Sequence, residues 1–211
     1  MTNLDFQAAI FDLDGTLVDS MPHWRGLLED FLEPYGVTPD REAKAAVCQM
    51  TLRQAAVYAK NRYCLEESVD ELYQQLKKQE ESIYTHRCTL KPGVADYLEA
   101  LKQRRIPMGI ATLAEKKCAK RALKRLGIQK YFSCLLTDED VGKGKNSPEL
   151  YLATAKKLKC PPDRCAVFED SVAHGTVAKQ AGFRVYAVKD ATNADRYAAY
   201  AASVDGEAPW Q

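Results

Sequence analysis

Acidic side chains, a hydroxyl group and a lysine follow the ends of short apolar runs in this 211-residue chain. Carboxylate oxygens are good ligands for a divalent cation such as Mg2+, and a lysine beside them can neutralise a phosphate group. A cation held in this way also lets a carboxylate attack an anionic phosphate as a nucleophile. The residues that suit this chemistry are Asp12, Asp14, Thr112, Lys145, Glu169 and Asp170.

The apolar runs that precede these residues read as buried strands of a parallel sheet. Amphipathic helical patterns lie between them, for example the apolar stripe of Val94, Tyr97, Leu98 and Leu101. Strands that alternate with helices predict an open α/β sheet of the Rossmann-like kind, in which ligands bind beyond the carboxyl ends of the strands. The expected strands are Ala8–Phe11, Pro107–Thr112, Cys134–Thr137, Cys165–Phe168 and Arg184–Val188.

One long stretch interrupts the alternation of strands and helices. Between Ser20 and Arg87 no apolar run reads as a buried strand, and Ser68 with Glu71 forms a capping box at the start of one helix. We therefore expect a core domain of residues 1–18 and 88–211 and a helical cap domain of residues 19–87. The helices expected in the cap are 27–35, 41–50, 52–62 and 69–84.

The segment FDLDGTLVDS at residues 11–20 resembles the DxDGT signature of the haloacid-dehalogenase superfamily. Thr112 matches the second motif of that superfamily, and Lys145 followed by Pro148 matches the third. Glu169-Asp170-Ser171 matches the fourth. The resemblance covers the whole chain, and it implies an α/β core with a helical cap, similar to the beta-phosphoglucomutase-like and phosphoglycolate phosphatase-like subgroup.

Two positions depart from the superfamily pattern. Asn146 stands where a proline usually follows the motif lysine, and Leu113 stands where a small polar residue is common. Neither change removes a group that the chemistry requires, although backbone donors to a phosphate could be shifted. A second lysine, Lys143, is an alternative to Lys145, which we favour because Pro148 fixes the register of the motif.

The two aspartates of the first motif divide the chemistry between them. We expect Asp12 to attack phosphorus and form an aspartyl phosphate, and Asp14 to act as general acid and then as general base. In a continuing strand, Asp14 would share a face with Asp12 at a distance of roughly 6.6 Å, and Gly15 would allow a sharp turn. The alternative is a purely structural role, in which these aspartates only cap a helix or form a turn.

A magnesium ion is the cofactor that this set of residues predicts. Asp170 is the expected side-chain ligand, with Glu169 bound directly or through water, and Asp12 completes the set. The resemblance adds the backbone carbonyl of Asp14 as a ligand. Thr112 is expected to donate a hydrogen bond to a phosphoryl oxygen, Lys145 to neutralise its charge, and Leu113 to line the substrate site.

The cap residues that could touch the rest of the substrate are His23, Trp24 and Arg53. Arg53 could bind a second anionic group. Trp24 occupies a place where sugar-phosphate mutases of this kind often have histidine, and His23 cannot replace it because adjacent helical residues point about 100° apart. This departure favours a phosphatase over a mutase.

Three functions remain open on the sequence alone. The first is a magnesium-dependent phosphatase of a small metabolite, such as a sugar phosphate or phosphoglycolate. The second is a phosphomutase of the beta-phosphoglucomutase type, and the third is a non-enzymatic phospho-receiver. The last is disfavoured because receivers lack DxDGT and a long helical insert.

Composition excludes other classes of protein. Lysine and arginine number 30 against 29 acidic residues, so the net charge of +1 does not suggest binding to nucleic acid. No apolar run is long enough for a membrane helix, and we expect no signal peptide in residues 1–7. The seven cysteines are scattered without a CxxC motif. We expect free thiols, a cytoplasmic protein, and a monomer or weak homodimer.

Overall fold

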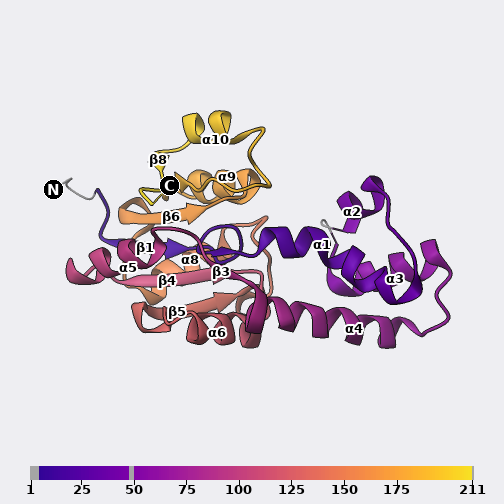
Figure 1. The fold of residues 1–211 in the computed structure, drawn as a ribbon. Coiled ribbons are helices and arrows are strands. Elements are labelled where there is room, and N and C mark those ends of the chain that lie inside the picture. The colour runs from indigo at the N-terminus through magenta and orange to yellow at the C-terminus, as the bar shows by residue number, and fades with distance from the viewer. Residues whose placement is uncertain (1–4, 48–49, 211) are drawn as a thin grey trace. The chain divides into compact units, whose positions relative to one another are not determined.

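The computed structural model describes residues 5–47 and 50–210. The chain divides into two compact units (Figure 1). One consists of the chain up to Asp19 together with the chain from Thr89 onward, and the other is Ser20–Cys88. No helix among the described residues is both long enough and apolar enough to cross a bilayer.

The first unit is built on a six-stranded parallel sheet with the strand order β5-β4-β1-β6-β7-β8. This confirms the predicted open α/β sheet. A second sheet of two antiparallel strands joins Val18 to Leu90 and Asp19 to Thr89. The strands are β1 (Ala8–Phe11), β2 (Val18–Asp19), β3 (Thr89–Leu90), β4 (Met108–Thr112), β5 (Phe132–Thr137), β6 (Cys165–Glu169), β7 (Arg184–Ala187) and β8 (Gly206–Glu207).

Successive side chains of the central strands point to opposite faces of the sheet, and the side chains on both faces are buried. Ile10 packs on one face in a cluster with side chains of α8 and α9. Its neighbour Phe11 points to the other face, where its ring stacks on Phe168 at 4.7 Å between centroids. Tyr97 and Trp210 complete that second cluster. Apolar side chains on both faces explain why these strands read as continuous apolar runs.

The helices of this unit connect the parallel strands. Gly175 in α9 allows a close approach, since an added Cβ would lie 2.0 Å from the hydroxyl oxygen of Tyr200 in α10. The helices are α5 (Val94–Gln103), α6 (Lys116–Arg125), α7 (Asp138–Val141), α8 (Glu149–Lys157), α9 (Val172–Gln180) and α10 (Tyr197–Ser203), with 3-10 turns η3 (Gln129–Tyr131) and η4 (Pro162–Arg164).

Every regular element among the described residues of the second unit is a helix, as the sequence predicts. Capping boxes begin two of its helices: Thr51 with Gln54, and the predicted pair Ser68 with Glu71. Its elements are α1 (Met21–Leu32), η1 (Glu33–Tyr35), α2 (Arg41–Val47), α3 (Leu52–Tyr63), α4 (Val69–Ser82) and the short π-helix η2 (Ile83–Arg87).

The structure differs from the predicted elements at several places, and one predicted helix is described only in part. The first helix of the insert begins at Met21 rather than at Leu27, since Pro22 lies in its first turn, where proline is tolerated. The helix predicted at 41–50 is described only as far as Val47, because residues 48 and 49 lie outside the described part. The short strands β2, β3 and β8 were not predicted, because two residues carry no periodicity.

Candidate active site

The carboxyl ends of three adjacent strands lie at one edge of the parallel sheet. Phe11 at the end of β1 pairs with Phe168 of β6 and with Ile110 of β4. The backbone N–H of Asp12 donates to the carbonyl of Phe168 at 3.0 Å, which fixes Asp12 directly beside the end of β6. Thr112 ends the strand on the other side of β1.

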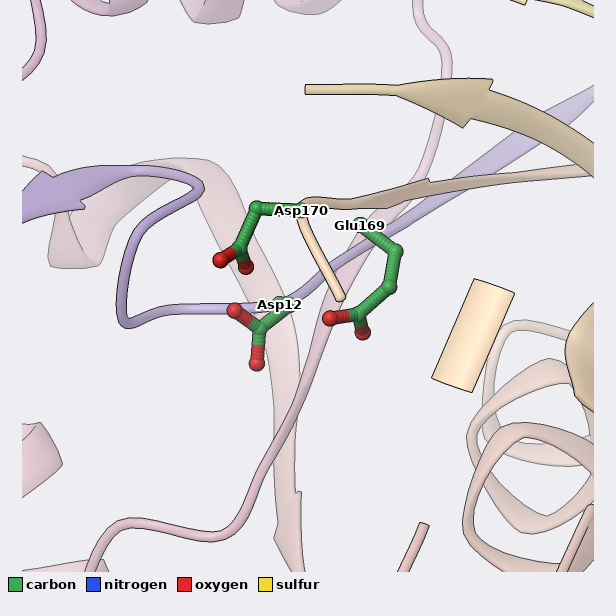
Figure 2. Close-up of side chains that lie close together, drawn as sticks. All are labelled: Asp12, Glu169 and Asp170. Atoms are coloured by element: carbon green, nitrogen blue, oxygen red, sulfur yellow. The ribbon is translucent and has the colours of Figure 1, made fainter. Parts of the chain in front are cut away.

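Three carboxylates converge at this edge (Figure 2). Asp12, Glu169 and Asp170 each offer a carboxylate oxygen, and these oxygens lie within 4.8 Å of one another. The three residues are no more than 7% exposed. Negative charges this close and this deeply buried need a compensating cation. An all-oxygen set of buried carboxylates fits a hard divalent ion such as Mg2+.

The pKa values of Asp12 and Asp170 are raised because the carboxylates are buried close together. Burial, and then the neighbouring Glu169 carboxylate, raise the pKa of Asp12 from its ordinary 3.8 to about 7, although Lys145 acts in the opposite direction. Burial also raises the pKa of Asp170 well above its usual range, with further contributions from Asp12 and Glu169. The site therefore resists full ionisation in the absence of a bound cation.

Lys145 supplies one positive charge to this cluster. Its side chain is 1% exposed, and its ammonium group forms ion pairs with Asp12 and, at 2.9 Å, with Glu169. Burial alone would lower the pKa of Lys145, but the two carboxylates outweigh it and hold the pKa above its usual range. The competing Lys143 pairs instead with Glu149 on the surface.

Glu169 is the most heavily contacted acid in the cluster. One of its oxygens accepts from Lys145 at 2.9 Å and from the hydroxyl of Tyr151 at 2.8 Å. The other accepts from the backbone N–H of Ser171 at 3.2 Å and lies 3.8 Å from Nδ1 of His174. Burial would raise the pKa of Glu169, but Lys145 and His174 outweigh it and lower the pKa to about 2. Glu169 is thus the charged partner of Lys145.

The turn that follows Asp12 is shaped around Asp170. Gly15 has a φ of +79°, and an added Cβ would lie 2.5 Å from Oδ2 of Asp170. Thr16 donates from Oγ1 to Oδ1 of Asp170 at 3.1 Å. A side chain at position 15 would therefore displace the carboxylate, and this close approach accounts for the glycine.

Asp14 lies in the same turn, where it forms an isolated bridge with Val18. The sequence-based assumption that Asp14 shares a strand face with Asp12 is wrong, because β1 ends at Phe11 and the chain turns immediately afterwards. Asp14 nevertheless lies close enough to raise the pKa of Asp12. Its carboxylate is not part of the three-residue cluster.

Thr112 and Leu113 occupy the end of β4 and the residue after it. Thr112 is 1% exposed, and its Oγ1 accepts a hydrogen bond from the backbone N–H of Ala114 at 3.0 Å. This bond leaves the hydroxyl hydrogen available to donate. Leu113 is 46% exposed. The end of β4 therefore offers one polar hydrogen and one exposed apolar side chain.

The predicted cap residues belong to the helical unit. Arg53 pairs with Asp70 at 2.9 Å, and its guanidinium lies 5.7 Å from the centroid of the Tyr73 ring. Its side chain remains 61% exposed. His23 is partly buried in α1, and Trp24 contacts the ring of Tyr84 edge-on.

Four polar residues that sequence reasoning did not assign to the site contact it directly. Tyr151 bonds the Glu169 carboxylate, and Thr16 bonds the Asp170 carboxylate. Tyr200 and Asn193 donate to the backbone carbonyls of Glu169 and Asp170. Thr16 lies in the DxDGT segment, whereas Tyr151, Asn193 and Tyr200 lie in no recognisable motif. A buried polar residue within an otherwise apolar helical stripe, as at Tyr151, is the one available signal.

Comparison with known proteins agrees with this geometry. A family model described as haloacid dehalogenase-like hydrolase matches residues 9–188. A phosphorylated carbohydrates phosphatase of Thermotoga maritima is 28% identical over 188 residues, which cover 89% of this chain and 87% of the relative. A validoxylamine A 7'-phosphate phosphatase of Streptomyces hygroscopicus subsp. limoneus is 31% identical over 186 residues, covering 84% of this chain and 83% of the relative.

Two further relatives extend the comparison. A beta-phosphoglucomutase of Bacillus subtilis is 26% identical over 185 residues, covering 83% of this chain and 80% of the relative. The crystal structure of CbbY from Rhodobacter sphaeroides with phosphate has a TM-score of 0.70 at 22% identity, covering 86% of this chain and 85% of that one. At that identity the likeness concerns the fold alone.

Proposed function

Because the chain belongs to the haloacid dehalogenase-like hydrolases and is a phosphatase of that family, we propose that it hydrolyses a small phosphorylated metabolite through an aspartyl phosphate on Asp12. The substrate class is a sugar phosphate or phosphoglycolate. The observation that carries this proposal is the convergence of Asp12, Glu169 and Asp170 within 4.8 Å, with buried Lys145 paired to two of them.

In the first half of the reaction, a carboxylate oxygen of Asp12 attacks phosphorus. The bond between phosphorus and the ester oxygen breaks with its electron pair, and Asp14 protonates the departing alkoxide. In the second half, Asp14 takes a proton from water, whose oxygen attacks the phosphoryl group. Phosphate leaves, and Asp12 is regenerated. Asp14 suits this role because it lies in the turn next to Asp12 without belonging to the carboxylate cluster.

Two residues are proposed to hold the transferring phosphoryl group. Lys145 neutralises its negative charge, and the buried ammonium group is already oriented by Asp12 and Glu169. Thr112 donates its hydroxyl hydrogen to a phosphoryl oxygen, and the bond from the N–H of Ala114 helps to orient the hydroxyl. Preorganised donors of this kind avoid reorganisation during the reaction.

Mg2+ is the proposed cofactor. Asp12 and Asp170 would bind it through their carboxylates, Asp14 through its backbone carbonyl, and Glu169 directly or through water. When bound, the ion neutralises charge on the phosphoryl group and reduces its repulsion of the nucleophile. The lysine and tyrosine contacts of Glu169 support the water-mediated arrangement for that residue.

The helical unit is proposed to act as a cap that touches the non-phosphate part of the substrate. Arg53 borders an open hollow of about 840 Å3 within that unit, whose lining includes Thr51, Gln54 and the exposed Val57. A cation beside apolar and polar groups suits a second anionic group on a metabolite. His23 and, on the core, Leu113 complete the proposed substrate contacts.

The test is Mg2+-dependent phosphate release from a panel of phosphorylated metabolites by the purified chain. Asp12→Asn should abolish turnover, because an amide oxygen is a poor nucleophile. Asp96→Asn, which removes an exposed carboxylate in α5, should leave turnover unchanged. Equal activity of wild type and Asp12→Asn would contradict the assignment.

The similarity to a beta-phosphoglucomutase supports one second reaction, the transfer of phosphate within a hexose phosphate. Isomerisation of glucose 1-phosphate faster than phosphate release would favour it, and Trp24 argues against it. Membership of a hydrolase family excludes the phospho-receiver hypothesis.

We further propose that the protein acts in the cytoplasm as a monomer or weak homodimer. The six cysteines within the described residues are free thiols, which supports a reducing compartment. Cys48 lies outside the described residues.

A further inference from the structure

The acidic pair at the end of β6 is held by its backbone as well as by its carboxylates. Tyr200 donates from its hydroxyl to the carbonyl of Glu169 at 3.0 Å. Asn193 donates from its amide nitrogen to the carbonyl of Asp170 at 2.8 Å. Both donors come from the segment that follows β7, so two consecutive peptide groups of the acidic pair are bonded by one stretch of chain.

Each donor is itself fixed. Asn193 is 3% exposed, and its amide also donates to the carbonyl of Val188 at 2.8 Å, while its oxygen accepts from the backbone N–H of Asp190 at 3.0 Å. Both amide hydrogens of Asn193 and one of the two lone pairs on its side-chain oxygen are therefore used in hydrogen bonds. Asp190 in turn forms an ion pair with Lys91 at 2.9 Å.

Tyr200 is fixed by packing. Its side chain is 1% exposed, and its hydroxyl lies over Gly175 of α9, where no larger residue would fit. The carbonyl of Glu169 also accepts from the backbone N–H of Val188 at 3.0 Å, so the tyrosine adds a second donor to a strand hydrogen bond that already exists. The hydroxyl thus holds a peptide group that the sheet alone would leave with one partner.

The direction of a side chain is set by the orientation of its own peptide group. Fixing the carbonyls of Glu169 and Asp170 therefore restrains the backbone and, with it, the direction of the Cα–Cβ bond from which each carboxylate extends. Hydrogen-bond partners of ligating side chains orient metal ligands, and their loss typically costs about 10-fold to 100-fold in metal affinity or activity. Donors to the backbone that carries the ligands act in the same direction.

We propose that Asn193 and Tyr200 are positioning residues that orient the acidic pair for binding Mg2+. This inference rests on the proposed function of the same site. In this role neither Asn193 nor Tyr200 touches the reacting atoms. Substituting either residue removes a bond to the backbone and leaves the hydrogen bonds of the Glu169 and Asp170 carboxylates in place.

The test measures Mg2+ binding by the full chain without substrate, from the rise in unfolding temperature of the metal-free protein with added Mg2+. Asn193→Ser should raise the Mg2+ dissociation constant about 10-fold. Tyr200→Phe should raise it by a smaller factor, because the backbone N–H of Val188 still donates to the Glu169 carbonyl. In activity assays, both variants should need more Mg2+ for half-maximal rate and recover most of the wild-type kcat when Mg2+ is saturating.

The matched control is Thr154→Val. Thr154 is fully buried, and its hydroxyl donates to the carbonyl of Leu150 at 2.7 Å within α8, so the variant loses a buried bond of the same kind away from the acidic pair. It should lower the unfolding temperature without changing the Mg2+ dissociation constant. Should Asn193→Ser not fold, Tyr200→Phe decides the matter.

Folded variants that bind Mg2+ as tightly as wild type would overturn the positioning role and leave the proposed function intact. Equal weakening by Thr154→Val would overturn it as well, since the effect would then be one of stability. A wild-type protein that does not bind Mg2+ at all would overturn the positioning role and the proposed function together.

Discussion

Ion pairs in the two units show how burial changes the role of a charged side chain. Lys145 and its carboxylate partners in the core are almost fully buried. Arg53 and Asp70 in the helical unit are 61% and 76% exposed. A buried charge must keep its partners, whereas exposed pairs contribute at most about 1 kcal/mol. Changes in the buried core pairs should therefore cost far more than changes in the exposed pair of the helical unit.

The largest expected effect comes from removing the buried cation. Lys145→Met would leave Asp12 and Glu169 without their positive partner, and should cost about 3–5 kcal/mol of unfolding free energy. Urea denaturation of the metal-free protein measures this. Lys143→Met removes the surface lysine paired with Glu149 and should cost less than about 1 kcal/mol. Equal losses in the two variants would break the contrast between buried and exposed pairs.

A pH dependence should follow from Asp12. Its pKa is raised from 3.8 to about 7 in the folded chain, so the folded state binds the proton more tightly than the unfolded state does. The contribution of this group to stability is therefore greatest below about pH 4, falls as the pH rises towards 7, and is constant above. The difference of about three pH units corresponds to at most about 4 kcal/mol.

The measurement compares wild type with Asp12→Asn in the presence of a chelator at several pH values. Asn cannot ionise, so the stability of the variant relative to wild type should increase between pH 4 and pH 8. Added Mg2+ should favour the ionised carboxylate and reduce the wild-type decline. If the difference in stability between the two proteins does not change with pH, the pKa of Asp12 is not raised in the folded state.

Two glycines with similar backbone conformations, one in each unit, differ in what surrounds them. Gly15 in the core has a φ of +79° and touches Asp170, whereas Gly36 in the helical unit has a φ of +66° and no atom within 4 Å of an added Cβ. Gly36→Ala should cost about 1 kcal/mol from backbone strain alone. Gly15→Ala should cost more and also weaken Mg2+ binding, because the Asp170 carboxylate must move. Thermal unfolding with and without Mg2+ distinguishes the two costs.

The smallest effect on stability is expected for Arg53→Ala, at less than about 1 kcal/mol. If Arg53 binds a second anionic group, this variant should raise KM for substrates that carry such a group and leave kcat nearly unchanged. Arg62→Ala on the same helix, where Arg62 pairs with the exposed Asp40, is the matched control. A KM that rises equally in both variants would argue against a specific role.

The sheet was predictable because its strands are buried on both faces. Runs such as Ala8–Phe11 appear in the sequence as uninterrupted apolar segments between turn residues, and the structure places β1 at those residues. The capping box at Ser68 likewise marked the start of α4. The two-residue strands β2 and β3 depend on pairing between distant segments, which leaves no local pattern.

The site residues likewise divide into those marked by local sequence patterns and those placed only by tertiary packing. Asp12, Lys145, Glu169 and Asp170 could be nominated because they follow strand ends or lie in motifs, and the structure brings them together. Tyr151, Asn193 and Tyr200 could not, because their contacts with the acidic pair depend on tertiary packing. The geometry of Asp14 was misjudged because the end of a strand is set by its neighbours in the sheet.

The most direct test of the account is to trap the reaction intermediate. A rapid acid quench of the Mg2+-loaded protein during turnover, followed by peptide mapping by mass spectrometry, should find a phosphoryl group on Asp12 and none on Asp14. A phosphoryl group on any other residue, or its absence from Asp12 in a burst that releases product, would contradict nucleophilic attack by this aspartate.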